Sequence, residues 1–435
     1  MPKFTKANQF VLYCTSYVIY NLFFHPLRHF PGPKLAAGTR LFPAWYLATG
    51  RRHKYNAWVH AKYGEIVRTA PDQLSFINDQ AWRDIFMHRQ GHPQLQKTLP
   101  FPRSGTYNII NAPDDIHARQ RKTLSHAFSE RALREQEPLI TTYVDLLVEH
   151  MHEDAKAGKA VDMVGYLTFL TFDIIADLSF AAPLGALRDR KAHPWMTSFF
   201  NSIRIGTIIT QFMLIPGVRY LMMLVAYPLR AVQRRQADFT EDKVSERLAQ
   251  GSERPDFMGA VLRNNEKAGD GDGMTRAEIG STFGILMIAG SETTATLLSG
   301  CLFLLLKNPD VLWKLQREVR GAFANEADIS VTRVNSLPYL LAVLEESLRY
   351  YPPVPVALGR RTPPEGTTIC GQWVPGGIAV GIPQLAANHS PINFVDPDKF
   401  VPERFLPDRD PKYAKDRRAV LQPFSAGPRN CLGRK

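Results

Sequence analysis

Residues 424–433 read Phe424-Ser-Ala-Gly427-Pro-Arg429-Asn-Cys431-Leu-Gly433. A buried cysteine is usually just a small apolar side chain. Here a glycine-containing loop lets backbone N–H groups point at the sulfur of Cys431, and Arg429 and the start of a helix add positive charge, so the thiolate is favoured. A thiolate on an apolar-walled loop suits a haem iron, because electron donation from sulfur favours cleavage of the O–O bond. We therefore expect Cys431 to be a metal ligand.

A second unusual stretch, Ala289-Gly290-Ser-Glu292-Thr293-Thr294, lies midway along a long apolar helix expected over residues 275–307. Glycine inside a helix costs about 1 kcal/mol relative to alanine, and an acid beside two hydroxyls suits an apolar core poorly. We expect Gly290 to open a groove for a diatomic ligand, and Glu292 and Thr293 to relay protons. The alternative, a solvated helix face, is disfavoured by the apolar residues on both sides.

Composition and charge narrow the class of protein. The 435 residues are 45% hydrophobic and 22% charged, which disfavours a disordered chain and a polytopic membrane protein. The four cysteines form no Cys-x-x-Cys pair, which argues against a disulfide framework and an all-cysteine zinc site. The net charge of +12 lies at the ends, because residues 1–60 hold eight Lys/Arg and no acid, and residues 411–435 hold seven against Asp416 alone. Such ends favour anionic lipid or an acidic protein; we expect no nucleic acid as a partner.

Two apolar segments bear on membrane contact. Residues 7–24 carry no charge but include several polar residues, so they predict either a marginal span or interfacial anchor, or a first helix packed on the body. The Phe30-Pro-Gly-Pro33 stretch that follows predicts a stiff hinge, because proline cannot continue a helix. Residues 205–229 are also strongly apolar, but Pro216, Gly217 and Arg219 interrupt them. They predict a buried helix pair or an apolar lid.

The remaining pattern sets the fold class. Residues 66–69 and 74–77 predict a short hairpin, and the chain from Asp114 to about residue 350 is mostly helical in pattern. Fourteen of the 32 prolines lie between residues 352 and 428, so that section must consist of loops and short strands. We expect one large domain, mainly α with a small β-rich region.

At every fixed position residues 424–433 match Phe-x-x-Gly-x-Arg-x-Cys-x-Gly, and the sequence resembles the cytochromes P-450, the haem-thiolate monooxygenases. The resemblance implies a cytochrome P-450-like fold, haem b (iron protoporphyrin IX) as cofactor, Cys431 as axial ligand and Arg429 as a contact of a haem propionate. It also implies that Glu292 and Thr293 belong to the oxygen-activation motif.

Six further residues acquire roles through the same resemblance. Glu346 and Arg349 match the family's Glu-x-x-Arg pair, and Arg404, in Pro402-Glu-Arg-Phe405, would complete a structural triad behind the cysteine loop. His117 and Arg121, four apart on a predicted helix, resemble the family's propionate-binding pair, and Arg360 resembles a third propionate contact. Taken one at a time, residues of these types are more often ordinary surface residues.

The resemblance implies insertion of one oxygen atom from O2 into a hydrophobic small molecule, with electrons from NADPH through a separate reductase. It is strongest to fungal members that open with Phe-His-Pro-Leu-Arg and Phe-Pro-Gly-Pro-Lys, here residues 24–28 and 30–34, many of which act in secondary metabolism. We expect an anchor over residues 1–29 and a haem domain over residues 30–435. The expected protein is monomeric, lies on the endoplasmic reticulum membrane facing the cytosol, and docks the reductase on residues 411–435.

Two other readings remain open. Family members normally continue for a helix and a β-hairpin after the cysteine, whereas four residues follow Cys431 here, so the chain could be a truncated, catalytically impaired paralogue. Alternatively, a haem-thiolate enzyme can catalyse a rearrangement without net oxygenation, although the presence of Glu292 and Thr293 argues against it.

Overall fold

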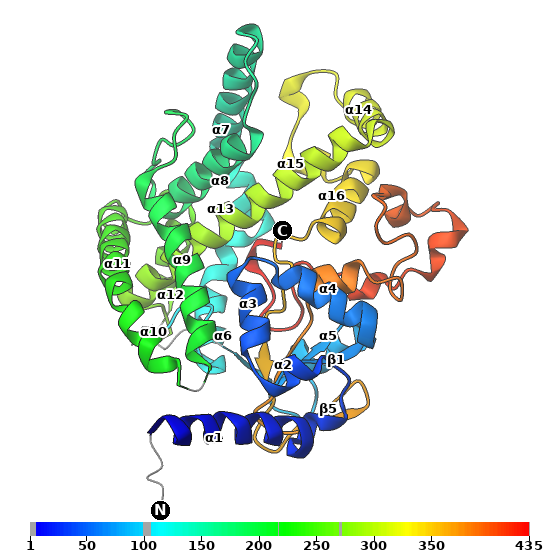
Figure 1. The fold of residues 1–435 in the computed structure, drawn as a ribbon. Helices are drawn as coiled ribbons and strands as arrows, with labels where there is room; N and C mark the ends of the chain where they lie inside the picture. The colour runs from blue at the N-terminus through cyan, green and yellow to red at the C-terminus, as the bar shows by residue number, and fades with distance from the viewer. Residues whose placement is uncertain (1–5, 99–105, 216, 269–271, 435) are drawn as a thin grey trace, which may run out of the picture.

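The structure is a computed structural model that describes residues 6–98, 106–215, 217–268 and 272–434. Helices form most of it, and a small sheet lies at one end (Figure 1), as the sequence predicts. The helices are α1 (Lys6–Ile19), α2 (Lys34–Gly38), α3 (Leu41–Ala48), α4 (Arg52–Tyr63), α5 (Asp79–Phe86), α6 (Asp114–Ser125), α7 (Glu130–Lys156), α8 (Met163–Phe180), α9 (Pro194–Met213), α10 (Arg219–Val225), α11 (Tyr227–Leu248), α12 (Phe257–Lys267), α13 (Arg276–Lys307), α14 (Pro309–Ala322), α15 (Val331–Val334), α16 (Pro338–Tyr350) and α17 (Gln384–Asn388).

The main sheet contains strands from both the N-terminal and the C-terminal part of the chain. Its strands are β1 (Ile66–Ala70), β2 (Gln73–Phe76), β3 (Gln96–Lys97), β4 (Arg360–Arg361) and β7 (Ala379–Gly381), in the order β1-β2-β7-β4-β3. Strands β2 and β7 run parallel, and the other neighbours run antiparallel. The predicted hairpin is confirmed as β1 and β2. Strands β5 (Thr367–Ile369) and β6 (Gln372–Val374) form a second hairpin inside the proline-rich section.

Helix α13 is the central element of the helical half. Thr275 and Glu278 form a capping box at the start of the predicted helix, and Asn308 and Pro309 end it and begin α14. One face of α13 packs against α8 in the largest core, which includes Phe172, Ile175 and Leu286. Both helices are long and apolar enough to cross a membrane, but each contributes to this core, so that property is weak support for a span.

The N-terminal helix lies along the surface of the body. Asn21 and Leu27 are buried, and Asn21 donates to the Gly38 carbonyl and accepts from Arg68. The predicted proline hinge is fastened to β1, because the Arg68 N–H donates to the Pro31 carbonyl (2.7 Å). The separate anchor over residues 1–29 stays a prediction, and residues 1–5 lie outside the described part of the chain.

Residues 205–229 are not a buried helix pair. They form the end of α9, all of α10 and the start of α11, and α10 has no buried residue. A turn at Gly217 meets the Phe10 ring of α1, since a Cβ there would come within 2.5 Å of that ring; Pro216 lies outside the described residues. We call the exposed side chains on α1 and on α10 with its flanks the apolar surface; it comprises Phe10, Val11, Leu12, Tyr13, Leu214, Tyr220, Leu221, Leu224, Val225 and Tyr227.

Candidate functional site

The cysteine loop is shaped by one glycine. Gly427 has φ of +75°, and a Cβ there would lie 2.0 Å from the Phe86 carbonyl oxygen, so only glycine fits between the loop and the end of α5. The Cys431 N–H donates to the Phe424 carbonyl (2.8 Å), which closes the loop. The loop thus has a fixed shape that presents Cys431, ahead of a short 3₁₀ turn over Leu432–Arg434.

The electrostatics of Cys431 are only partly as predicted. Its thiol is exposed on one side, and burial by the protein on the other side raises its pKa, while the Gly433 N–H and the Arg121 guanidinium act in the opposite direction. A backbone N–H and a cation therefore act on the sulfur, but the cation is Arg121 of α6 and not the expected Arg429, and the loop alone does not favour the thiolate. A bound metal ion deprotonates a coordinating thiol outright, so metal ligation is what would set its charge.

Helix α6 is fastened to the cysteine loop by two arginines. Arg121 donates to the backbone carbonyl of Asn430 (2.6 Å) and to its side-chain amide oxygen. Arg429, 9% exposed, donates to the Asp114 carboxylate (2.7 Å) and to the Ala112 carbonyl (2.7 Å). The structure therefore brings the predicted residues of α6 and of the loop together.

Arg360 is not a surface residue. It is 2% exposed on β4, and its guanidinium lies over the Phe86 ring, 4.8 Å from the centroid. Among the described residues its Nε has no hydrogen-bond partner, and its guanidinium makes one long contact (3.4 Å), to the Gly359 carbonyl. A buried guanidinium without a partner is costly, so this arginine has the properties of a group that awaits an anion.

The positive side chains around this site lower one another's pKa values. Burial, then Arg429, Lys97 and Arg121, lower the pKa of His117, which is 5% exposed, to about 4. Burial and Arg429 lower the pKa of Arg360 to about 10. In the described part of the chain, the one carboxylate in the cluster is Asp114; burial raises its pKa, but the hydrogen bonds from Arg429 and Gln96 outweigh that effect and lower it. The residues thus fit haem, whose two propionates would supply the missing negative charge.

The oxygen-activation motif lies on an unbroken stretch of α13. Thr293 donates its hydroxyl to the Ala289 carbonyl (2.5 Å), and burial raises the pKa of the Glu292 carboxyl. The groove expected at Gly290 is a wrong prediction, because its missing side chain points at Ile175 of α8, where a Cβ would come within 2.6 Å. This glycine lets two core helices approach closely.

The predicted triad is a fully buried network with a fourth member. Glu346 accepts from Arg349 (2.7 and 2.8 Å), from the Val401 N–H (2.7 Å) and at longer range from Arg404. Arg404 also donates to Asp416 (2.6 Å), and both residues of that pair have side chains with 0% exposure. Two arginines therefore face two carboxylates, and the charge of the network is balanced.

Two cavities border the helical half. One, of about 580 Å³, lies between α9, α11 and α13 and is lined on α13 by Ala277, Gly280, Ser281, Gly284 and Ile285. Helical spacing continues this accessible face through Ile288 to Glu292. The cavity therefore lies on the same side of α13 as the oxygen-activation motif.

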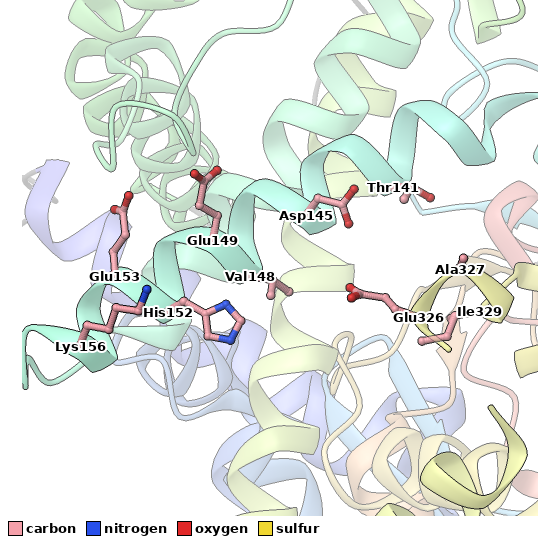
Figure 2. A pocket seen from close by; sticks show the side chains of 10 residues that line it. All are labelled: Thr141, Asp145, Val148, Glu149, His152, Glu153, Lys156, Glu326, Ala327 and Ile329. Carbon is pink, nitrogen blue, oxygen red and sulfur yellow. The ribbon is translucent and has the colours of Figure 1, made fainter. Parts of the chain in front are cut away.

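The larger cavity, of about 970 Å³, is a surface groove between α7 and the short turn Glu326–Asp328 (Figure 2). No predicted site residue lines it. Carboxylates from both walls border it, including Asp145, Glu149 and Glu326. Among the described residues no group of His, Cys, Asp and Glu could hold a metal ion.

Three residues of the site have no counterpart in the sequence predictions. Asp114 and Lys97 belong to the cation cluster, and Asp416 belongs to the buried network. Asp416 carried a signal, because it is the sole acid in a basic segment. The sequence held no signal for Lys97, because it lies in a two-residue strand whose pairing with β4 is known only from the structure.

The comparisons with known proteins agree with this geometry. The family model described as "Cytochrome P450" matches residues 37–435. "Cytochrome P450 monooxygenase lcsI" of Purpureocillium lilacinum is 42% identical over 98% of this chain and 83% of its own length. "Cytochrome P450 monooxygenase aclL" of Aspergillus oryzae is 42% identical over 98% and 86%. "Averantin hydroxylase" of Dothistroma septosporum is 41% identical over 98% and 80%.

These relatives are fungal monooxygenases similar to this chain over nearly its whole length. The family model covers the sheet, the long helix and the cysteine loop together. The chain therefore belongs to the cytochrome P450 family of haem-binding monooxygenases.

Proposed function

We propose that this protein inserts one oxygen atom from O2 into a hydrophobic small molecule in fungal secondary metabolism, with electrons delivered from NADPH by a separate reductase. The observation that carries the proposal is the folded cysteine loop beside a cluster of cations in which Arg360 is buried and unpaired. The fungal relatives support the setting, since one of them is named for hydroxylation of averantin.

In this proposal Cys431 would bind the haem iron, and His117, Arg121, Arg360 and Arg429 would hold the propionates. Haem supplies the centre at which dioxygen is activated. The protein supplies the anionic sulfur, fixes the loop through Gly427, and neutralises the carboxylates by charge-assisted hydrogen bonds. Arg429 has Asp114 as a competing partner, so a propionate would share this arginine rather than take it alone.

Glu292 and Thr293 would move protons. The Glu292 carboxyl, whose pKa is raised by burial, makes no hydrogen bond or ion pair with the described residues and can pick up a proton from water in the cavity on its side of α13. The Thr293 hydroxyl donates to Ala289 and keeps its lone pairs free, so it can accept a hydrogen bond and pass a proton on. This pair supports oxygen insertion over a rearrangement.

The cavity of about 580 Å³ would admit the substrate. Its walls combine Phe199, Ile203 and Ile285 with polar groups such as Gln236 and Ser281 and with the carboxylates of Asp238 and Glu241. Such a lining suits an apolar molecule that carries a few oxygen atoms.

The apolar surface supports contact with a membrane. Its α1 and α10 parts meet at Phe10 and Gly217, and residues 1–60 add positive charge that anionic lipid attracts. We propose a position on the endoplasmic reticulum membrane with the haem domain in the cytosol and the protein as a monomer. Within residues 411–435, Arg417 is neutralised by Glu65 (2.8 Å), whereas Lys415 and Arg434 are exposed and suit an acidic reductase.

A carbon monoxide difference spectrum of the reduced, purified chain tests the haem-thiolate site. The wild type should show the long-wavelength band of a thiolate-ligated haem, and Cys431→Ala should lose it. Cys370→Ala is the matched control, because Cys370 is a free cysteine held by Asn78 outside this site. An unchanged spectrum in Cys431→Ala, or a wild type that takes up no haem, would contradict the proposal.

A further inference from the structure

Gln236 is a buried polar side chain in the wall of the cavity between α9, α11 and α13. It lies in the middle of α11, is 7% exposed and faces two serines of α9. Its amide nitrogen donates to the hydroxyl oxygens of Ser198 (3.1 Å) and Ser202 (3.0 Å). An amide nitrogen carries two protons, so both of its donors are in use and the side chain is held in one position.

The proton of Ser202 fixes which way round this amide lies. The Ser202 hydroxyl donates to the Ser198 carbonyl (2.9 Å), so toward Gln236 its oxygen can only accept. An amide oxygen in that place would meet a lone pair and not a proton. Gln236 therefore turns its NH2 group toward α9 and its Oε1 atom away from the two serines.

The Oε1 atom of Gln236 faces the cavity. Among the described residues no N–H or O–H group donates to it, yet the atom is not closed off from water. The rest of the side chain is nearly all buried, so the surface that stays accessible lies on the cavity side. A shielded acceptor without a partner, in the wall of a cavity, suits a hydrogen-bond donor carried by a bound molecule.

Other polar groups that line the cavity differ from this acceptor. Ser281 already accepts a hydrogen bond from the Asn108 amide (3.1 Å). Glu241 is paired with Arg276 (2.8 Å), and Asp238 is exposed to water. A hydrogen bond that is shielded from water discriminates between ligands more strongly than a carboxylate that water already solvates.

We propose that Gln236 is a specificity-determining residue, whose Oε1 atom accepts a hydrogen bond from a hydroxyl group of the substrate, remote from the carbon that is oxidised. The inference rests on the proposed function and narrows its substrate class to hydrophobic molecules with a neutral hydrogen-bond donor. The lining of the cavity on α13 ends at Ile285, and Ala289 of the oxygen-activation motif lies four residues, about 6 Å, further along the helix. An elongated substrate can therefore extend from the cavity to the motif.

A simpler role for Gln236 is to tie α11 to α9 through Ser198 and Ser202. That role predicts a loss of stability when the amide is removed, but the loss would affect every ligand alike. Recognition of a hydroxyl group predicts instead that the preference between two ligands changes. The two roles therefore differ in a measurable ratio.

The experiment compares two probes that differ at one oxygen, biphenyl-4-ylmethanol and its methyl ether. Each is titrated into the full-length, haem-loaded chain, and the shift of the Soret band gives its dissociation constant. Gln236→Leu removes the acceptor at similar volume, and Ser202→Ala leaves the acceptor but frees the amide to turn. Gln250→Leu is the matched control, because Gln250 is an exposed glutamine beyond the end of α11 and outside the cavity lining.

Wild type and Gln250→Leu should bind the alcohol about five- to tenfold more tightly than the ether, as expected for one neutral hydrogen bond. Gln236→Leu should bind the two probes about equally, and Ser202→Ala should give a ratio between these limits. The change should come from weaker binding of the alcohol.

Equal affinities of wild type for the two probes, no binding of either, or an unchanged ratio in Gln236→Leu would overturn the inference. If Gln236→Leu does not fold, a wild-type ratio in Ser202→Ala would overturn it. Tighter binding of (biphenyl-4-ylmethyl)trimethylammonium than of the alcohol would assign recognition to Asp238 and also overturn it. Failure of the wild type to take up haem would instead overturn the proposed function.

Discussion

Replacement of Glu346 by glutamine is the sharpest test of the buried ion network. Glu346→Gln keeps the volume of the side chain but removes its charge, and one carboxylate oxygen becomes an NH2 group that faces existing N–H donors. Four hydrogen bonds converge on that carboxylate, at 2.7 Å from Arg349 Nε and Val401 N, 2.8 Å from Arg349 Nη2 and 3.4 Å from Arg404 Nε. Arg349 and Arg404, both with 0% exposure, would then share Asp416 as their one negative neighbour in the network.

Removing one partner of a buried ion pair usually costs about 3–5 kcal/mol, because the other charge stays buried and unpaired. Native proteins are stable by roughly 5–15 kcal/mol, so the variant should lose a large share of its stability. Urea unfolding followed by tryptophan fluorescence measures the shift in midpoint, and the Soret band of the same samples measures haem retention.

The matched control is Glu345→Gln. Glu345 is the neighbouring residue on α16, is exposed, and its carboxylate makes no hydrogen bond or ion pair with the described part of the chain. This variant should unfold within about 0.5 kcal/mol of wild type. Equal midpoints for the two variants would refute the reasoning that the buried network stabilises the haem side of the fold.

Three other changes test separate parts of the structure. Thr293→Ala should retain haem but release more hydrogen peroxide per NADPH consumed, and tight coupling in the variant would contradict the proton relay. Gly427→Ala should lose haem, and its stability should fall by at least about 1–3 kcal/mol, because φ is +75° and the Phe86 carbonyl lies 2.0 Å from the new Cβ. Gly371 has a similar φ of +73° but open space around it, so Gly371→Ala should unfold at a higher urea concentration than Gly427→Ala. Burial lowers the pKa of His60 to about 4, below the value near 6.5 of an unfolded chain. The neutral side chain therefore stabilises the fold above pH 6.5, and this contribution is lost as the pH falls toward 4. His60→Gln should flatten this part of the curve of stability against pH, and an unchanged curve would refute the assignment.

Local patterns predicted much of the fold. The capping box at Thr275, the proline at position 309 and the hairpin near residue 70 are decided by neighbouring residues, and the structure has all three. The environment of residues 205–229 was harder to predict, because an apolar run looks the same in sequence whether it is buried in a core or exposed to lipid. The structure places α10 on the outside, beside α1.

The candidate site was likewise predicted only in part from the sequence. Cys431 and Arg429 stand in one short motif, so their proximity is a property of the loop. The burial of Arg360 and its approach to Lys97 depend on the pairing of β3 with β4, and strands of two residues are too short to be predicted from sequence. Gly290 was misread for the same reason, since the direction of its missing side chain depends on how α8 packs against α13.

The contact between the Phe10 ring and the turn at Gly217 has a practical consequence for protein engineering. Shortening the N-terminus to obtain a water-soluble enzyme would strip this ring from the α9–α10 corner at the same time. A trimmed version would lack this contact, so the packing of α10 measured on it would differ from that in the full-length chain.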